Sequence, residues 1–298
     1  MAEHFRSGYV ALVGRPNVGK STLLNRLLGQ KISITSRRPQ TTRHRILGIR
    51  TTRHAQVMYV DTPGIHSHAG RAMNRFMNRA AIDALHDVDI IIFMVEGGGW
   101  TDEDEGILEK IVHTGLPVVL VINKIDRLAD KTGLLLQLEQ LSGKMSFQEM
   151  IPLSARSGDH VDVLEKAIER LLPVAPPYYP DDQITDRSER FLAAEFIREK
   201  LFRKLGREVP YGLTVEIERF REEGDVVRIH GLILVERPGQ KAIVIGKHGA
   251  LLKEVGRQAR LDIEQTLKKR VYLQLWVKVK QGWADDERAL RSLGYTDE

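Results

Sequence analysis

Short apolar runs alternate with amphipathic stretches through the first 172 residues of the chain. Strand-like runs occupy residues 9–13, 56–60, 90–95, 118–122 and 150–153. Near-continuous apolarity of this kind is typical of parallel strands covered on both faces. Helical spacing of apolar positions fills the intervals at residues 20–28, 75–85, 102–114, 134–141 and 161–172. The pattern predicts a doubly wound α/β domain with a mostly parallel sheet, whose ligands bind beyond the carboxyl ends of the strands.

A proline-rich stretch interrupts this alternation. Four of the eight residues 173–180 are proline. Because proline fixes φ and lacks an amide donor, we expect a semi-stiff, extended connector there. The sequence therefore predicts one domain at residues 1–172, a linker at 173–181 and a second domain at 182–298.

The second domain has a different order of elements. A helix at 189–205 precedes two strands joined by a turn at 222–225. A glycine turn at 246–249, a long helix at 250–267, a strand at 271–279 and a terminal helix at 285–293 follow. This order predicts a smaller α+β domain.

Composition narrows the class of protein. A chain of 298 residues suits two domains, and the absence of cysteine excludes disulfides, zinc-thiolate sites and thiol catalysis. Residues 1–8 lack the apolar core of a signal peptide, and the longest apolar runs are far below the ~20 residues of a membrane span. We therefore expect a cytoplasmic protein. The net charge of +5 is too small an excess to locate a nucleic-acid site.

Residues 14–21 read Gly-Arg-Pro-Asn-Val-Gly-Lys-Ser, directly after an apolar strand and at the start of a helix. Glycines let backbone amides converge on phosphate oxygens, and the helix amino terminus adds positive potential. Lys20 is predicted to neutralise the β and γ phosphates, and Ser21 to ligate Mg²⁺. The alternative is a glycine-rich turn without a ligand, and the motifs that follow argue against it.

Asp61-Thr62-Pro63-Gly64 follows the strand at 56–60. Asp61 therefore lies at the carboxyl end of a strand, where it can hold magnesium through water. The amide of Gly64 can meet a γ phosphate, which makes the next segment sensitive to the loss of that phosphate.

Asn123-Lys124-Ile125-Asp126 follows the strand at 118–122 and indicates the base. A carboxylate accepts hydrogen bonds from guanine N1 and the exocyclic amine, whereas adenine would leave that charge unpaired. The motif favours GTP or GDP over ATP. Ser154-Ala155-Arg156, after the strand at 150–153, can place an amide near guanine O6.

A threonine between the first two motifs is needed to ligate magnesium in the γ-phosphate state. Thr41 and Thr42, in the basic stretch 37–45, both qualify, and we favour Thr42. The alternative is that this stretch is an ordinary solvated loop. The predicted GTP-binding residues are Gly14, Arg15, Pro16, Asn17, Val18, Gly19, Lys20, Ser21, Thr22, Asp61, Thr62, Pro63, Gly64, Asn123, Lys124, Asp126, Ser154, Ala155 and Arg156. The predicted catalytic residues are Lys20, Asn17, Thr42 and Gly64, and the magnesium ligands are Ser21, Thr42 and Asp61.

These motifs together resemble the translation-factor-related GTPases. GRPNVGKS with PQTTRH and DTPGI is similar to the Era-like branch, as are the Gly-x-x-Gly sequence in residues 244–252 and the stretch 275–295. The resemblance covers almost the whole chain. It implies a P-loop GTPase domain followed by a type II KH domain. It also implies a GTPase that binds the 3′ end of 16S ribosomal RNA, assists assembly of the small (30S) subunit, acts as a monomer and contacts the membrane peripherally.

The RNA prediction concentrates on the Gly-x-x-Gly loop. Such a loop alone is usually a turn, but here it precedes a long helix and carries Lys247 and His248 in its middle. Periodicity alone would make residues 241–245 a strand, whereas the KH pattern makes them a short helix, and we follow the pattern. Cations near the loop can meet phosphates, and apolar residues can line a groove for unstacked bases. The predicted RNA-binding residues are Lys241, Ile243, Ile245, Gly246, Lys247, His248, Gly249, Lys253 and Arg257.

Three observations leave the mechanism open. Ile65 stands where many relatives of this fold place a water-orienting glutamine, so intrinsic hydrolysis should be slow or use another device. Asn17 matches an asparagine that some related GTPases use to hold K⁺, and its alternative role is to brace the loop. Arg71, Arg75 and Arg79 recur at helical spacing, either as a solvated face or as a contact for RNA or the second domain. An RNA-binding scaffold that uses GTP structurally, or a sister GTPase acting on another RNA, is the rival interpretation.

Overall fold

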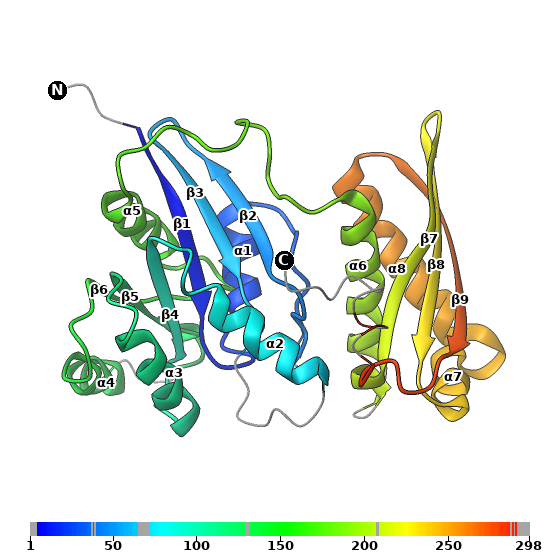
Figure 1. Ribbon diagram of the computed structural model, residues 1–298, viewed down its shortest axis with the longest axis horizontal. Helices are drawn as coiled ribbons and strands as arrows, with labels where there is room; N and C mark the ends of the chain where they lie inside the picture. The colour runs from blue at the N-terminus through cyan, green and yellow to red at the C-terminus, as the bar shows by residue number, and fades with distance from the viewer. Residues whose placement is uncertain are drawn as a thin grey trace. The chain divides into compact units, whose positions relative to one another are not determined.

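The computed structural model describes residues 5–36, 38, 40–64, 72–128, 132–206, 209–286, 288 and 290. They form two compact units (Figure 1). The first unit contains the described residues of Met1–Ser33, Thr42–Ala69 and Met77–Asp186. The second contains those of Ile34–Thr41, Gly70–Phe76 and Arg187–Glu298.

The first unit is built on a six-stranded sheet in the order β2-β3-β1-β4-β5-β6. The strands are β1 (Arg6–Val13), β2 (Ile46–Thr51), β3 (Ala55–Asp61), β4 (Ile90–Glu96), β5 (Val118–Asn123) and β6 (Glu149–Pro152). All neighbouring pairs are parallel except β2, which runs antiparallel to β3. This confirms the predicted doubly wound, mostly parallel sheet. β2 is an additional edge strand that the sequence analysis did not predict.

Among the described residues, the helices of this unit are α1 (Lys20–Leu28), α2 (Ala72–Asp83), α3 (Asp102–Val112), α4 (Thr132–Ser142) and α5 (Val161–Leu171). The part of α2 up to Phe76 belongs to the second unit. The central strand β4 is apolar because both of its faces are covered, and residues 90–95 are 0% exposed. α3 begins with a capping box, in which the Thr101 hydroxyl accepts from the Asp104 amide and the Asp104 carboxylate accepts from the Thr101 amide.

The proline-rich segment packs along the first unit. The Ser7 amide donates to the Pro173 carbonyl (3.2 Å), and the Gln56 side-chain oxygen accepts from the amides of Tyr178 and Tyr179 (2.7 and 2.9 Å). The Gln56 side-chain amide in turn donates to the Tyr179 carbonyl at 2.8 Å. One buried glutamine thus satisfies the backbone of a segment that is too rich in proline to pair as an ordinary strand.

In its described residues, the second unit has a three-stranded sheet in the order β7-β8-β9 and the helices α6, α7 and α8. Its elements are α6 (Glu189–Lys204), β7 (Leu213–Glu223), β8 (Val226–Val235), α7 (Pro238–Ile245), α8 (Ala250–Leu267) and β9 (Arg270–Val279). β7 is antiparallel to β8, and β9 is parallel to β8. The α+β prediction is confirmed, and residues 241–245 are helical, as the KH pattern required. The predicted helix at 285–293 falls largely outside the described residues.

None of the helices in the described ranges has both the length and the apolar character that crossing a membrane requires.

Candidate nucleotide and RNA sites

The four predicted GTP motifs lie at the carboxyl ends of strands β1, β3, β5 and β6. The phosphate loop turns on two glycines with positive φ. A Cβ atom on Gly14 (φ 153°) would lie 2.4 Å from the Met94 carbonyl oxygen. A Cβ on Gly19 (φ 111°) would lie 2.3 Å from Asn123 Nδ2. No other residue type fits these positions, because the loop approaches β4 and the Asn123 motif too closely.

Lys20 lies across this loop. Its side chain is 6% exposed, and Nζ donates to the carbonyls of Gly14 (2.7 Å) and Arg15 (3.1 Å). Burial lowers the pKa of Lys20 to about 8, while the Asp61 carboxylate acts in the opposite direction. Among the described residues, the hydrogen bonds of this desolvated ammonium go to neutral carbonyls, so a phosphate would add a Coulomb attraction that low dielectric strengthens.

Asp61 gathers hydroxyl groups around one carboxylate oxygen. Its Oδ2 accepts from Ser21 (2.7 Å) and from Ser33 (2.8 Å), and Thr42 Oγ1 lies 2.9 Å from Ser21 Oγ. Burial raises the pKa of Asp61 against these hydrogen bonds. Its Oδ1 is buried, with no hydrogen-bond partner among the described residues. A buried, unpaired carboxylate oxygen beside two hydroxyls is a donor set that fits Mg²⁺.

The structure distinguishes the two candidate threonines. Thr42 reaches Ser21, whereas the Thr41 hydroxyl donates to the Arg38 carbonyl and lies 2.7 Å from Ser36 Oγ. Thr41 is therefore used to shape its own loop. This geometry favours Thr42 as the ligand.

The base-recognition motif is organised by Asn123. Its amide nitrogen donates to the Val18 carbonyl (2.7 Å), and its oxygen accepts from the backbone amides of Lys124 (2.7 Å) and Ala155 (3.0 Å). The Ser154 hydroxyl donates to Asp126 Oδ1 at 2.7 Å. Asn123 thus joins three motifs, and Ser154 orients an otherwise exposed carboxylate.

The other predicted GTP-binding residues either pack close to the phosphate loop and β1 or are exposed. A Cβ on Gly64 would lie 2.9–3.0 Å from Pro16 atoms, so the Gly64 backbone runs close to the phosphate loop. The Thr62 hydroxyl donates to the Leu12 carbonyl at 2.8 Å. Arg156 is exposed, and its carbonyl accepts from Arg26. Asn17 has positive φ (66°) and is exposed, and within the described ranges its side chain has no hydrogen bond.

Two residues at this site were missed by the sequence analysis. Ser33 is fully buried and donates to Asp61, and nothing in its local sequence indicates that role. Glu96 ends β4, where polar residues of such sheets gather, so its position was a usable signal. Its carboxylate pairs with Arg15 (3.2 Å) and Lys124 (2.9 Å). Burial acts to raise the pKa of Glu96, but Lys124 and Arg15 hold it below its usual value.

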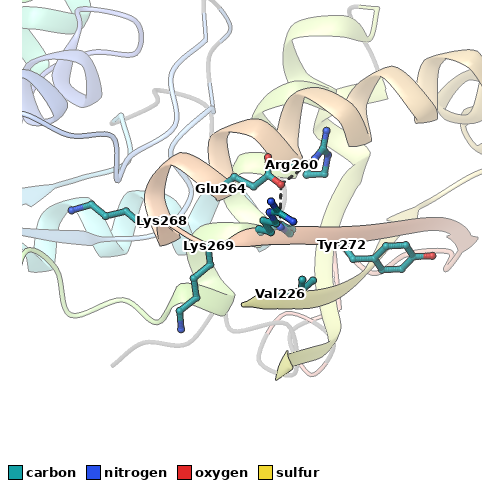
Figure 2. A pocket seen from close by; sticks show the side chains of 8 residues that line it. Val226, Arg260, Glu264, Lys268, Lys269 and Tyr272 are labelled. Carbon is teal, nitrogen blue, oxygen red and sulfur yellow. Dashed lines mark hydrogen bonds and ion pairs between the residues drawn. The ribbon is translucent and has the colours of Figure 1, made fainter. Parts of the chain in front are cut away.

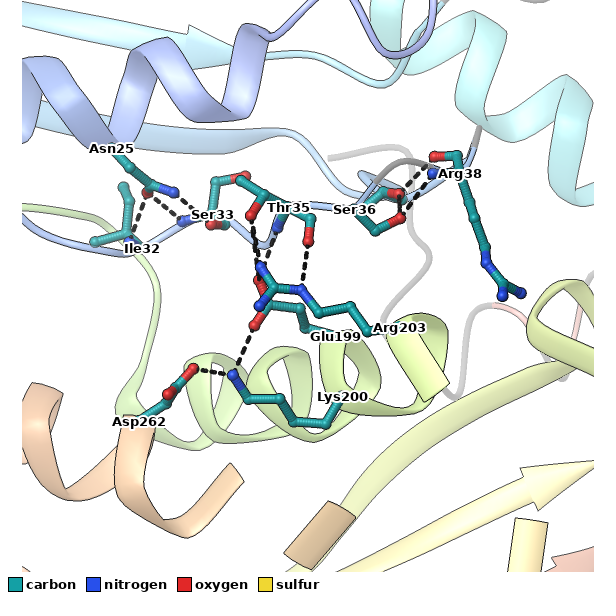
Figure 3. A network of polar contacts seen from close by, with 11 residues as sticks. Asn25, Ile32, Ser33, Thr35, Ser36, Arg38, Glu199, Lys200, Arg203 and Asp262 are labelled. Carbon is teal, nitrogen blue, oxygen red and sulfur yellow. Dashed lines mark hydrogen bonds and ion pairs between the residues drawn. The ribbon is translucent and has the colours of Figure 1, made fainter. Parts of the chain in front are cut away.

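Residues Ile34–Thr41 belong to the second unit, although Ser33 and Thr42 on either side belong to the first. Asn25 Oδ1 fixes the chain just before Ile34 by accepting hydrogen bonds from the amides of Ile32 and Ser33. Beyond it, the Thr35 amide donates to Glu199 Oε1 on α6 at 2.9 Å (Figure 3). Arg198 donates to the Thr41 carbonyl at 2.6 Å.

The α6 charges that hold this segment are unusually buried. Glu195, Arg198, Glu199 and Lys200 are all 0–5% exposed. Arg198 donates to both carboxylate oxygens of Glu195, and Lys200 pairs with Glu199 (3.0 Å) and Asp262 (Figure 3). Buried charges are tolerated only when paired, so this network defines one position for the segment on α6.

The Gly-x-x-Gly loop connects α7 to α8 through a one-turn 3₁₀ helix, Lys247–Gly249. Gly246, His248 and Gly249 all have positive φ (73°, 52° and 78°). A Cβ on Gly246 would lie 2.7 Å from Leu251 Cβ, so glycine is required for the chain to turn into α8. Lys247 and His248 are both exposed at the tip.

The other predicted RNA-binding residues surround this loop. Lys241 and Lys253 are exposed, and Ile243 is 51% exposed while its neighbour Val244 is fully buried. Arg257 is exposed but is held by Glu254 at 2.9 Å, which neutralises part of its charge. On α2, Arg75 and Arg79 are exposed; Arg71 and Ile65 lie outside the described residues.

Comparisons with known proteins agree with this arrangement. Residues 9–124 match the family model of the 50S ribosome-binding GTPases, and residues 208–284 match that of the KH domain. GTPase Era of Ectopseudomonas mendocina is 58% identical over 292 residues, covering 98% of each chain. GTPase Era of Pseudomonas aeruginosa is 56% identical, covering 98% of this chain and 96% of its own.

Two solved structures are similar over the whole fold. One is an Era variant of Aquifex aeolicus bound to GDP and AlF4⁻, with a TM-score of 0.95 and 40% identity over 98% of this chain and all of its own. The other, with the same TM-score, identity and coverage, is Era in complex with MgGDPNP and nucleotides 1506–1542 of 16S ribosomal RNA. The chain therefore belongs to the GTPase Era family, with a GTP-hydrolysing P-loop domain followed by a KH domain.

Proposed function

We propose that this GTPase binds the 3′ end of 16S ribosomal RNA through its Gly-x-x-Gly loop and assists assembly of the small (30S) ribosomal subunit. The observation that carries the RNA proposal is the loop itself. Gly246 and Gly249, both with positive φ, present Lys247 and His248 to solvent beside the exposed Ile243. KH loops of this form clamp about four backbone nucleotides. The related Era structure holds nucleotides 1506–1542 of that RNA.

In the nucleotide site, we assign phosphate binding to the loop amides and Lys20. Ser21, Thr42 and Asp61 would hold Mg²⁺, which when bound supplies positive charge against the phosphate oxygens. Gly64 gives its backbone amide to the γ phosphate. The related structure with MgGDPNP supports GTP, GDP and Mg²⁺ as the ligands of this site.

Guanine selection is assigned to Asp126. The Ser154 hydroxyl holds one of its carboxylate oxygens, so the carboxylate is oriented before the base arrives. Guanine offers two N–H donors to it, whereas adenine offers none and would leave the charge without a partner. Asn123 keeps the amide of Ala155 close to the motif, where it can meet guanine O6.

The Ile65 side chain cannot orient water, so rapid hydrolysis in this chain needs another device, and we assign K⁺ binding to Asn17. The Asn17 side chain is exposed and makes no hydrogen bond to the described part of the chain. No contact there supports the alternative role, in which Asn17 braces the phosphate loop. A loop asparagine with a free carbonyl oxygen can ligate a cation beside the phosphates.

The division into residues 1–172, a linker at 173–181 and residues 182–298 stays our proposal, as do monomeric state and a cytoplasmic location. Peripheral membrane contact stays a prediction from the resemblance alone. The rival scaffold function would show RNA binding with GTP turnover that does not respond to RNA. Multiple-turnover phosphate release with and without the RNA separates it from a working switch.

The RNA assignment is tested by replacing Lys247 and His248 with aspartate. Both glycines remain, so the turn is preserved, while two negative charges meet the RNA backbone. RNA affinity should fall, and the slope of log affinity against log salt should decrease by about 0.7 for each lost phosphate contact to a single strand. GTP affinity should be unchanged, because the phosphate loop belongs to the other unit.

A matched control carries Lys110→Asp and His86→Asp, at two exposed positions of the first unit. It changes the charge of the protein equally. Wild-type RNA affinity and salt slope in the loop variant would show that the Gly-x-x-Gly loop does not bind the RNA. Equal losses in both variants would attribute the effect to bulk charge.

A further inference from the structure

A second basic site lies at the opposite end of α8 from the Gly-x-x-Gly loop. A pocket of about 650 Å³ opens there between the end of α8 and the first residues of β8 and β9 (Figure 2). Its lining residues are Val226, Arg260, Glu264, Lys268, Lys269, Arg270, Val271 and Tyr272. Four of the eight are cations and one is an anion, so the pocket suits an anionic ligand.

Glu264, the one acidic residue among the eight lining residues, already accepts hydrogen bonds within the protein. Glu264 Oε1 accepts from Arg260 (3.0 Å) and from the Val271 amide (3.0 Å). Lys269 pairs with Glu222 on β7 at 2.5 Å. Lys268 and Arg270 are exposed, and within the described residues neither side chain makes a hydrogen bond or an ion pair. Two cations of the pocket are therefore available to a ligand.

Helix capping can explain Lys268 but not Arg270. It occupies the left-handed C-cap of α8 (φ 53°), where glycine or asparagine is favoured. A lysine there is also favourable for the helix dipole, and that alone would explain one cation in the last turn. It does not explain Arg270, which lies beyond the helix on β9 and lines the same pocket.

The wall of the pocket adds an aromatic surface. Tyr272 is 50% exposed, and the Arg228 guanidinium lies over its ring at 5.3 Å. An exposed tyrosine that lines the same pocket as free cations is a combination that suits nucleic acid, because the ring can meet a base or sugar while the cations meet phosphates.

We propose that this pocket binds backbone phosphates of the RNA, outside the stretch that the Gly-x-x-Gly loop clamps. The inference rests on the proposed RNA-binding function. α8 has 18 residues and so spans about 27 Å, which separates the two attachment points. The loop holds about four nucleotides, so only an RNA that extends beyond them engages the pocket.

The test uses the full chain with Lys268→Gln and Arg270→Gln, which removes both free cations and keeps polar side chains. The matched control is Arg53→Gln with Lys110→Gln, two exposed positions of the first unit with the same change in charge. Each protein is titrated with two RNAs, one covering nucleotides 1506–1542 of 16S ribosomal RNA and one single strand of about five nucleotides that fills only the loop.

For the long RNA, we expect the salt slope to decrease by about 1.4 and the affinity at 0.1 M salt to fall about 25-fold, since each lost contact removes about 0.7 log unit per tenfold change in salt. Binding of the short RNA should not change, and the control should behave as wild type. The Lys247→Asp, His248→Asp variant should weaken binding of both RNAs.

Three results would overturn the proposal. Unchanged binding of the long RNA by the pocket variant would leave the cations with their helix-capping role. Equal weakening for both RNAs would place the effect at the loop. Loss of binding to vesicles containing phosphatidylserine, with RNA binding intact, would identify the pocket as a lipid site. Failure of the wild-type protein to bind either RNA would instead refute the proposed function.

Discussion

Replacing Glu199 by glutamine should weaken the attachment of Thr35 to α6 and destabilise the second unit. The Glu199 carboxylate is fully buried and accepts from the Thr35 amide (2.9 Å), from Lys200 (3.0 Å) and from Arg203 (2.9 Å). Glutamine has the same shape but lacks the charge, and its amide group would face one of these donors.

The magnitude follows from the environment of each partner. Breaking a buried ion pair by removing one partner costs about 3–5 kcal/mol. Lys200 keeps Asp262, and the Arg203 side chain is 47% exposed, so water can solvate it. We therefore expect the lower end, about 3 kcal/mol, which at about 2 kcal/mol per molar urea lowers the midpoint by about 1.5 M.

Tryptophan fluorescence can measure this in a Trp100→Phe background. The two remaining tryptophans, Trp276 and Trp283, both belong to the second unit. Hydrogen exchange of the Thr35 amide reports the contact directly and should accelerate in the variant. Glu216→Gln, an exposed position on β7, is the control and should stay within about 0.5 kcal/mol of wild type. A Glu199→Gln protein with wild-type midpoint and wild-type Thr35 exchange would refute the argument.

Three further predictions concern the nucleotide site. Asp126→Asn should weaken GTP binding and shift preference toward xanthosine triphosphate, because the amide can donate to the extra carbonyl of xanthine; an unchanged preference in a competition assay would remove Asp126 from the base site. GTP hydrolysis should be faster in K⁺ than in Na⁺ at equal ionic strength, and Asn17→Ala should abolish the difference; equal rates for the wild-type protein in both salts would contradict the K⁺ assignment. Thr42→Ala should weaken Mg²⁺-dependent binding of a GTP analogue by about tenfold or more, the loss typical of one charged hydrogen bond, with GDP binding much less affected. Thr41→Ala is the matched control, and equal effects of the two changes would remove the distinction between the threonines.

Much of the first unit could be predicted because its signals are local. Each GTP motif follows one buried strand, so the strand, the turn and the functional side chain lie within about ten residues of one another. β2 was missed because it is an edge strand that follows a basic loop, and edge position is decided by the partner strand β3. Lys241–Ile245 shows the opposite case, since its apolar run reads as a strand and only the KH pattern identified the helix.

The sequence by itself determined the nucleotide motifs, most of the order of elements in both units and the Gly-x-x-Gly loop, since these depend on residue spacing within single strand–turn–helix segments. Only the tertiary structure decided that Ser33 meets Asp61, that Glu96 gathers Arg15 and Lys124, and that Thr42 rather than Thr41 reaches Ser21. It also decided that Thr35 and Thr41 are held by buried charges on α6. Those contacts join residues up to 164 positions apart, and a charged residue on a helix has the same local sequence whether it faces water or a buried partner.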